Sequence, residues 1–281
     1  MNQLGLNIFL KFISSRSIQL LGKYSCSLII CFVLASLKSF GATYYSYQSG
    51  DWAASSTWTT DPSGTLSVNS GIPVATDNIV ILNGRIVTIS SGSKTVATLQ
   101  INYGGTLDIT TTTGHNFGTV SGQGLLRLNS NTFPSGTYTS FVASTGGTVE
   151  YYNLNNTRIS NTQLTYNNLL VSNYSASANT VFIDNASSGI NYTINGNFDL
   201  KNNSTGSLSF NFGNSTASDN LLNLTVNGNF TVSSGCTVGV NNFSTAHNIP
   251  NSTVIVTPPV YSDYPVHTLF VYGNLTNCLM P

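Results

Sequence analysis

Two observations predict an all-β fold for this chain, with short strands stacked as the coils of a β-solenoid. Only 6% of the residues are charged and 40% are hydrophobic. The remainder is mostly Asn, Ser, Thr and Gly, which favour turns over helix interiors. In addition, one strand-turn-strand unit occurs three times, with a Gly at each bend between runs of alternating polarity. The copies are Ile194-Asn-Gly-Asn-Phe-Asp-Leu200, Val226-Asn-Gly-Asn-Phe-Thr-Val232 and Val271-Tyr-Gly-Asn-Leu-Thr-Asn277.

The spacing of these bends favours a solenoid over a helical repeat. Gly196, Gly228 and Gly273 are separated by 32 and then 45 residues, which suits coils interrupted by loops better than a fixed period. We expect Gly196 and Gly228 to occupy equivalent bends, each followed by an inward-pointing ring, Phe198 and Phe230. The alternative fold is a β-sandwich with Greek-key connections.

The N-terminus has the order of an export signal. Basic residues extend to Lys23, an apolar run covers 28–37, and small residues follow at Ser39, Gly41 and Ala42. We expect cleavage after residue 41 or 42, because the apolar run is too short to span a bilayer comfortably. The alternatives are an uncleaved anchor and a buried first strand.

Removal of this segment leaves a weakly acidic chain. Five basic residues then face nine acidic ones, and no basic stripe is present. This balance argues against nucleic acid and anionic membranes as partners. We expect no membrane span after cleavage of the signal.

The segment 44–58 is rich in aromatic residues set among Ser, Ala and Gly. We predict that it caps the open end of the core, because large rings bury much area at small entropic cost. The alternative is a ligand-binding platform on which sugar rings stack against Tyr45, Tyr47, Trp52 and Trp58.

Two β-branched runs, 79–82 and 86–89, flank Asn83-Gly84. Asn-Gly between such runs is the strongest short hairpin signal, so an antiparallel hairpin is predicted here. Asp77 and Arg85 flank it, and we interpret them as a turn Asp and a solvated Arg rather than an acid/base pair.

Further short strands follow at close spacing, with Gly at the bends between them. They cover 96–102, 106–110, 125–128 and 148–152. Residues 151–250 then contain 23 Asn, against seven in residues 51–150, and stacked Asn side chains can form hydrogen-bonded ladders. We place a soft boundary near Tyr151. This boundary divides residues 42–150, which hold the N-terminal cap and the first coils, from residues 151–281, which hold the Asn-rich coils.

Catalytic carboxylates are not evident in the sequence. A glycosidase needs two carboxyl groups about 5–10 Å apart, yet no two of the nine acidic residues lie within six positions. Only stacking across coils could bring acids together, for example Asp184, Asp199 and Asp219. We therefore predict that the chain is not an enzyme.

Metal and disulfide chemistry has little support either. His115, His247 and His267 stand in unlike contexts without ligand spacing, so we expect no metal site and no cofactor. Cys236 and Cys278 are the cysteines that remain after signal removal, which permits at most one bridge.

Several motifs resemble one group of bacterial proteins. They are Gly50-Asp-Trp52, Ser56-Thr-Trp58, Pro73, Asp77-Asn-Ile-Val-Ile81, Asn83-Gly84, Thr106-Leu-Asp108, Gly124-Leu-Leu-Arg-Leu128, Gly146-Gly-Thr-Val-Glu-Tyr-Tyr152 and the Asn-Gly-Asn-Phe units. Together they resemble large secreted surface proteins exported by the bacterial type IX route. The resemblance implies a right-handed parallel β-helix with adhesin-like character, at the outer surface of a Gram-negative bacterium or secreted from it. It supplies no catalytic residues.

Proteins of that group usually run longer and finish with a sorting domain, whereas this sequence stops at 277–281. We therefore expect a fragment whose C-terminal end is uncapped, or one that protects this end by self-association. The alternative is that 258–264 folds back as a cap.

The predicted function is a non-catalytic, structural or adhesive segment of a secreted or surface protein. Surface glycans and other cell-surface proteins are the partners that this role implies. The alternatives are a carbohydrate-binding module and a degenerate polysaccharide lyase or hydrolase.

Overall fold

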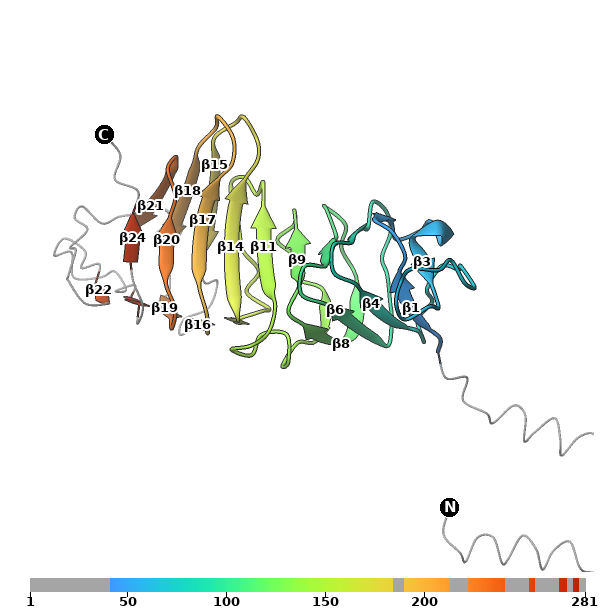
Figure 1. The fold of residues 1–281 in the computed structure, drawn as a ribbon. Helices are drawn as coiled ribbons and strands as arrows, with labels where there is room; N and C mark the ends of the chain where they lie inside the picture. The colour runs from blue at the N-terminus through green and yellow to red at the C-terminus, as the bar shows by residue number, and fades with distance from the viewer. Residues whose placement is uncertain are drawn as a thin grey trace, which may run out of the picture. The chain divides into compact units, whose positions relative to one another are not determined.

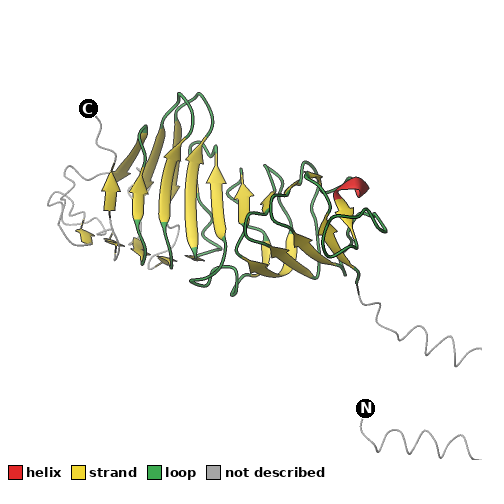
Figure 2. Ribbon diagram, viewed as in Figure 1, coloured by secondary structure: helices red, strands yellow, loops and turns green. Residues whose placement is uncertain are grey.

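The computed structural model describes residues 41–183, 190–212, 222–240, 253–255, 268–271 and 275–277. The chain divides into two units, 1–40 and 41–281. Nearly all of the predicted export signal therefore lies outside the described residues, and the following concerns the second unit. Its described part is all-β, as the composition predicted: strands joined by turns, one short 3-10 turn, η2 (Ser55–Thr57), and no α-helix (Figures 1 and 2).

Two mainly parallel sheets, A and B, form the first part of the stack. Their strands are β1 (Thr43–Ser46), β2 (Gly50–Asp51), β3 (Trp58–Thr59), β4 (Asn78–Ile81), β5 (Ile86–Thr88), β6 (Thr98–Ile101), β7 (Thr106–Asp108), β8 (Asn116–Gly122), β9 (Leu125–Leu128), β10 (Ser135–Thr137) and β11 (Thr148–Tyr152). Sheet A has the order β10-β8-β6-β4-β1-β3, and sheet B begins β2-β5-β7-β9-β11. From β4 to β11 the chain alternates between the sheets, so each new strand extends its sheet by one position.

Sheet B continues through the second part, where sheets C and D replace sheet A. The strands here are β12 (Thr157–Arg158), β13 (Thr165–Tyr166), β14 (Asn168–Asn173), β15 (Asn179–Ile183), β16 (Ile190–Ile194), β17 (Phe198–Asn202), β18 (Leu208–Phe212), β19 (Leu222–Val226), β20 (Phe230–Val232), β21 (Cys236–Val240), β22 (Thr253–Ile255), β23 (Thr268–Val271) and β24 (Leu275–Asn277). Sheet B adds β14-β17-β20-β24, sheet C is β12-β15-β18-β21, and sheet D is β13-β16-β19-β23-β22.

Pairing between successive coils is parallel throughout sheets B and C. In the described residues, antiparallel pairing occurs only between β1 and β3 and between β22 and β23. A Greek-key sandwich is built from antiparallel sheets, so this arrangement does not fit the alternative fold.

The coils lengthen where the third sheet begins. Hydrogen-bonded neighbours in adjacent coils are 20 residues apart at Asn78 and Thr98, 29 apart at Asn168 and Asn197 and 32 apart at Asn197 and Asn229. The Asn-rich composition therefore begins close to the point where the coils change shape. Sheet B runs through this point without a break, because β11 pairs with both β9 and β14.

The antiparallel hairpin predicted at Asn83-Gly84 is wrong. Strand β4 pairs with β1 and β6 in sheet A, whereas β5 pairs with β2 and β7 in sheet B. The turn itself is tight, because Arg85 N–H donates to the Leu82 carbonyl at 3.2 Å and Gly84 has φ +72°. A type II turn needs a positive φ at that position. Asn-Gly here makes a corner between two sheets.

The strand-turn-strand units lie one above another, as predicted. Gly228 N–H donates to the Gly196 carbonyl at 2.9 Å, so the two bends are equivalent. Before the bends, Val226 pairs with Ile194 on one side and Val271 on the other. The bend at Gly273 lies outside the described residues, but the flanking strands continue the register.

The rings after these bends point inward, which confirms the second part of the prediction. Phe198 and Phe230 are paired across sheet B and buried. Their rings are nearly parallel, at 5°, with centroids 4.7 Å apart. Phe210 of sheet C meets Phe198 edge-to-face at 5.2 Å, and Leu275 takes the next position beside Phe230. Stacked rings thus fill the core of the longer coils.

Asparagine ladders follow the corner between sheets D and B. Asn168 Oδ1 accepts a hydrogen bond from Asn197 N–H at 2.9 Å, and Asn197 Oδ1 accepts one from Asn229 N–H at 3.0 Å. At the opposite end of the strand, Asn173 Nδ2 donates to Asn202 Oδ1 at 3.2 Å. The Asn-rich composition therefore supplies side chains that bond one coil to the next.

Antiparallel strands cover two of the sheet edges. Strand β3 lies on β1 at the N-terminal end of sheet A, and β22 lies on β23 at the C-terminal end of sheet D. The prediction of an uncapped C-terminal end stays a prediction, because β22 lies on the last parallel strand of sheet D whereas β21 and β24 are the last described strands of sheets C and B. The segment 258–264, considered as an alternative cap, lies outside the described residues.

We expect Gly228→Ala to destabilise the protein by about 1–3 kcal/mol, the usual cost of overpacking. A Cβ at this bend would lie 2.4 Å from the Gly196 carbonyl oxygen of the adjacent coil. The matched control is Gly84→Asn. A Cβ there meets nothing within 4 Å, and Asn tolerates a positive φ. Urea unfolding of both variants is the measurement, and equal midpoints would contradict the close stacking of the bends.

Candidate functional site

The aromatic segment at the N-terminus packs into the core. Trp52 and Trp58 are 1% and 0% exposed, and their rings meet edge-to-face at 5.0 Å. Trp58 Nε1 donates to the Trp52 carbonyl at 2.8 Å, and the Trp52 ring stacks on Phe117. The four-residue sugar platform is therefore not formed, because its two tryptophans have no face to offer. Tyr45 and Tyr47 are half-buried and remain the accessible members.

The acidic residues that the sequence analysis singled out are Asp77, Asp184, Asp199 and Asp219. Asp77 accepts hydrogen bonds from the N–H groups of Ala42 and Val74, at 2.8 and 2.7 Å, in line with its interpretation as a turn Asp. Asp199 is half-buried on β17, whereas Asp184 and Asp219 lie outside the described residues. In the described part of the chain no group of three or more His, Cys, Asp or Glu could hold a metal ion.

The two cysteines predicted to remain after signal removal have different outcomes. Cys236 is a free, buried thiol, and burial raises its pKa to about 11. Cys278 lies outside the described residues.

A charged cluster that the sequence did not predict lies on the outer face of sheet B. Arg127 Nε donates to Glu150 at 2.5 Å, and its Nη1 donates to Asp108 at 3.1 Å. The three residues are 19 and 23 positions apart and meet because β7, β9 and β11 are adjacent. The signal that could have found them is the alignment of 106–108, 125–128 and 148–152 as successive strands.

Two tyrosines contact the residues of this charged cluster. The Arg127 guanidinium lies 4.4 Å from the centre of the Tyr152 ring and 5.4 Å from that of Tyr174. Tyr152 OH donates to Asp108 at 2.9 Å and Tyr174 OH donates to Glu150 at 2.9 Å. Burial followed by the neighbouring carboxylates raises the pKa of both phenols, so they stay protonated donors.

The pKa of Arg127 is also raised. Burial opposes its charge, but Glu150 and Asp108 outweigh that effect. Each carboxylate is thus already occupied by the guanidinium and a phenol, and the cluster ties three coils together.

His115 is a buried titratable group of the shorter coils, 2% exposed. Its Nδ1 accepts a hydrogen bond from Lys94 N–H at 3.1 Å, and its ring stacks on Phe117 at 5.4 Å. Burial lowers its pKa, and the charge of Lys94 acts in the same direction. An acceptor Nδ1 carries no proton, so this geometry needs the neutral imidazole.

We expect the protein to lose stability as the pH falls below about 6.5, the ordinary histidine pKa. The unfolded chain binds a proton at His115 in that range whereas the folded chain does not, so the free energy of unfolding rises with pH there. The measurement is the melting temperature between pH 7.5 and 5.0 for the parent and for His115→Gln. A variant with the same slope as the parent would contradict the assignment.

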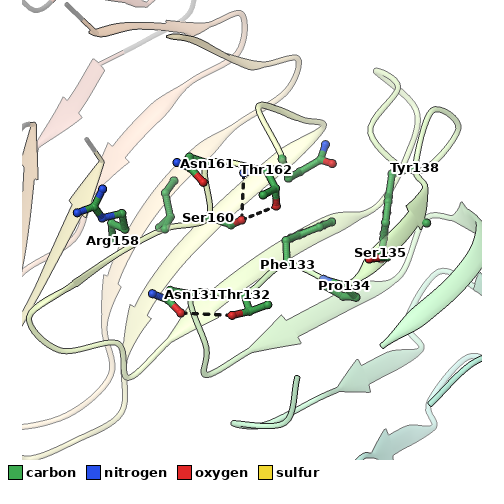
Figure 3. A pocket seen from close by; sticks show the side chains of 13 residues that line it. Asn131, Thr132, Phe133, Pro134, Ser135, Tyr138, Arg158, Ser160, Asn161 and Thr162 are labelled. Carbon is green, nitrogen blue, oxygen red and sulfur yellow. Dashed lines mark hydrogen bonds between the residues drawn. The ribbon is translucent and has the colours of Figure 1, made fainter. Parts of the chain in front are cut away.

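A cleft of about 690 Å³ opens where sheet A ends and sheets C and D begin. We call it the junction cleft. One wall comprises residues 131–136 and Tyr138, around β10, and the other comprises 158–163, between β12 and β13. Figure 3 shows both walls. The hydrogen bonds drawn there each join residues of one wall: the Ser160 and Thr162 hydroxyls at 2.8 Å, Thr162 N–H to Ser160 Oγ at 3.2 Å, and Thr132 Oγ1 to Asn131 Oδ1 at 3.5 Å.

The lining of the junction cleft is polar but almost uncharged. It carries hydroxyl and amide side chains, and Arg158 is the one charged residue among those that line it. Phe133 and Tyr138 add an aromatic pair, edge-to-face at 4.8 Å. The Tyr138 hydroxyl is buried and has no hydrogen-bond partner among the described residues. Sequence analysis did not predict this site, because its two walls meet only where sheet A stops.

A second hollow of about 540 Å³ adjoins the junction cleft. It shares Gly136, Tyr138 and Gln163 with the cleft, and adds Thr165 and Asn195 from sheet D and its loops, among others. Residues of the exposed strand β10 line both hollows.

None of the described residues forms a helix that is long and apolar enough to cross a membrane. No family model matches the chain, and no curated protein or solved structure matches it either.

Proposed function

We propose that the chain is a right-handed parallel β-helix that serves as a non-catalytic, adhesive or structural segment of a secreted surface protein. The observation that carries this proposal is sheet B, nine parallel strands in the order β2-β5-β7-β9-β11-β14-β17-β20-β24. An array of this kind presents a long, rigid outer face. Surface proteins that hold a partner at a fixed place need such a face more than they need a catalytic centre.

The handedness follows from a general rule. Each coil leaves a strand of sheet B, crosses the other sheets and returns to pair in parallel with the strand it left. Connections between parallel strands of one sheet are right-handed in about 98% of cases. The same hand is expected for every coil.

The chemistry of the outer face supports a non-catalytic role. The charged cluster has its carboxylates engaged by Arg127, Tyr152 and Tyr174. A glycosidase-like mechanism needs one carboxyl group to give a proton and the other to attack or activate water. In this cluster both carboxylates already accept hydrogen bonds from the guanidinium and a phenol, so neither is free to engage a substrate.

Export and surface location are part of the same proposal. They rest on the order of basic, apolar and small residues in 1–42 and on the resemblance to secreted surface proteins of the type IX route. A surface rich in Asn, Ser and Thr suits hydrogen bonding to glycans and to other surface proteins, which are the partners proposed.

A carbohydrate-binding module is the second candidate. The observation that favours it is the junction cleft, which is lined by hydroxyls, amides and an aromatic pair. The junction cleft therefore replaces the platform of Tyr45, Tyr47, Trp52 and Trp58 as the candidate sugar-binding site.

The proposed function is tested with the exported form of the chain. We expect it to be secreted without residues 1–41 or 1–42, to bind to cells or polysaccharide surfaces, and to release no reducing ends from polysaccharides. Mass spectrometry, a solid-phase binding assay and a reducing-sugar assay are the three measurements. An intact Met1 would contradict the export signal, and turnover of any polysaccharide would contradict the non-catalytic role.

A further inference from the structure

We propose that the junction cleft binds a short, neutral oligosaccharide. This inference rests on the proposed surface role, because it names the class of ligand that the surface segment would bind. The cleft was defined above by two walls, 131–138 and 158–163, on either side of the place where sheet A gives way to sheets C and D.

The lining offers the groups that sugars use. Besides Tyr138, seven residues of the two walls have hydroxyl or amide side chains: Asn131, Thr132, Ser135, Ser160, Asn161, Thr162 and Gln163. Hydroxyls and amides both donate and accept hydrogen bonds, so they can match sugar hydroxyls in either sense. Asn131, Ser135 and Asn161 are exposed, so a ligand can reach them without a change of the core.

The charges of the lining favour a neutral ligand. No carboxylate lines the cleft, and one guanidinium, Arg158, does. A cationic ligand or a metal ion would have no counter-charge there, and a polyanion would meet one cation along the whole cleft. The uncharged hydroxyl groups of a neutral sugar need no counter-charge of either sign.

The volume of the junction cleft and its aromatic pair also favour a small sugar as the ligand. A volume of about 690 Å³ falls in the range of roughly 300–1,000 Å³ that is usual for small-ligand sites. Phe133 and Tyr138 are 8% and 6% exposed, so they add a small apolar area among the polar groups rather than a stacking face. This mixture suits a sugar ring, which has polar edges and apolar C–H faces.

An unpaired hydroxyl supplies an independent indication. Tyr138 is 6% exposed, lines both hollows, and its hydroxyl has no partner among the described residues. A buried hydroxyl without a partner costs free energy. The hydroxyl is itself buried, so a ligand reaches it only if the ring turns toward the hollows; a hydroxyl-rich ligand then supplies the missing hydrogen bond, which an apolar ligand cannot.

An extended peptide is the competing occupant, because β10, β12 and β13 present strand edges at the step. Those strands are three, two and two residues long, and Gly136 interrupts β10 with φ +149°. Strand addition needs a continuous edge of main-chain groups, and ordinary strands are about 5–6 residues long. These edges are too short and too irregular to template a strand, so the saccharide is favoured.

Isothermal titration calorimetry of the exported chain tests the proposal. The probes are cellotetraose, laminaritetraose, mannotetraose and chitotetraose as neutral ligands, with tetragalacturonate as the charged comparison. We expect at least one neutral tetrasaccharide to bind with a Kd below about 1 mM. Binding of none of them, or of tetragalacturonate alone, would overturn the proposal.

Variants assign the binding to the cleft. Ser135→Trp fills the space beside β10, and Asn161→Ala removes one amide from the opposite wall. We expect at least about a tenfold loss of affinity for the first and a smaller loss for the second. The matched control is Ser144→Trp, an exposed serine that lines neither hollow, for which no loss is expected.

Melting temperatures separate a binding defect from a folding defect. Should Ser135→Trp fail to fold, Asn161→Ala decides, because its side chain is exposed. Unchanged affinity in the folded cleft variants would place the ligand elsewhere and overturn the proposal. Turnover of a bound probe would instead contradict the non-catalytic role while leaving the cleft assignment standing, so the two failures are distinguishable.

Discussion

Replacing Phe198 with Ala is expected to lower the free energy of unfolding by about 3–5 kcal/mol, the usual range for a core aromatic residue. Phe198 is 0% exposed, stacks on Phe230 at 4.7 Å and meets Phe210 edge-to-face at 5.2 Å. Truncation would open a cavity that the two neighbouring rings cannot fill, because each is held by its own strand. Urea unfolding followed by fluorescence and circular dichroism measures the effect.

The matched control is Phe182→Ala. Phe182 lies in β15 on the outer side of sheet C and is half-buried, so its loss should cost clearly less. Similar costs for the two variants would contradict the assignment of Phe198 to the interior of the stack.

Replacing Arg127 with Met is expected to cost about 3–5 kcal/mol, because removal of one partner leaves buried charges without compensation. Glu150 is 1% exposed and would keep the hydroxyl partners Ser172 and Tyr174 but lose its cation. The methylene part of the side chain is retained, so the change removes the guanidinium with its charge, its hydrogen bonds and its ring contacts. The measurement is chemical unfolding at neutral pH.

Two further variants separate charge from packing. Arg127→Met combined with Glu150→Gln should recover part of the loss, because the uncompensated carboxylate is gone. Lys201→Met removes an exposed cation from the outer face of sheet B and should be almost neutral. A double variant that is no better than Arg127→Met alone would show that the cluster does not act through its charges.

Sequence analysis located β6, β7, β9 and β11 closely. It also recognised two coils as equivalent where Gly and an aromatic residue recur. Gly196 and Gly228 stack, and Phe198 and Phe230 pair, because a sharp bend and a filled core impose the same residues on each coil. The preceding coil escaped detection. There Tyr166 pairs with Ile194 and Leu169 with Phe198, but the bend has no Gly and is one residue shorter.

Local signals were less informative about which strands pair. Asn83-Gly84 marks a real tight turn, with φ +72° at Gly84, yet the same turn serves a hairpin or a corner between sheets. The choice depends on partners about 20 residues away, such as the pairing of Ile79 with Leu99. Turn chemistry alone does not contain that information.

The charged cluster and the junction cleft depend on register and on a change of coil shape. Asp108, Arg127 and Glu150 are unremarkable in the sequence and meet only when their strands are aligned. The cleft arises because sheet A stops at β10 while sheet B continues. The tryptophans led to the opposite error. Trp52 and Trp58 are of a residue type that often stacks on sugars, but in the structure they are buried in the core.

Cysteine cross-linking on the outer face of sheet B tests the parallel stack most directly. Asp199 pairs with Leu170 in one adjacent coil and with Thr231 in the other. Neighbouring strands lie about 4.8 Å apart, within the Cα separation of about 4.4–6.8 Å that a disulfide accepts. We expect Leu170→Cys/Asp199→Cys and Asp199→Cys/Thr231→Cys to form disulfides on mild oxidation, identified by mass spectrometry. Leu170→Cys/Thr231→Cys, two coils apart, should not; its ready cross-linking, or failure of both adjacent pairs, would contradict the stack.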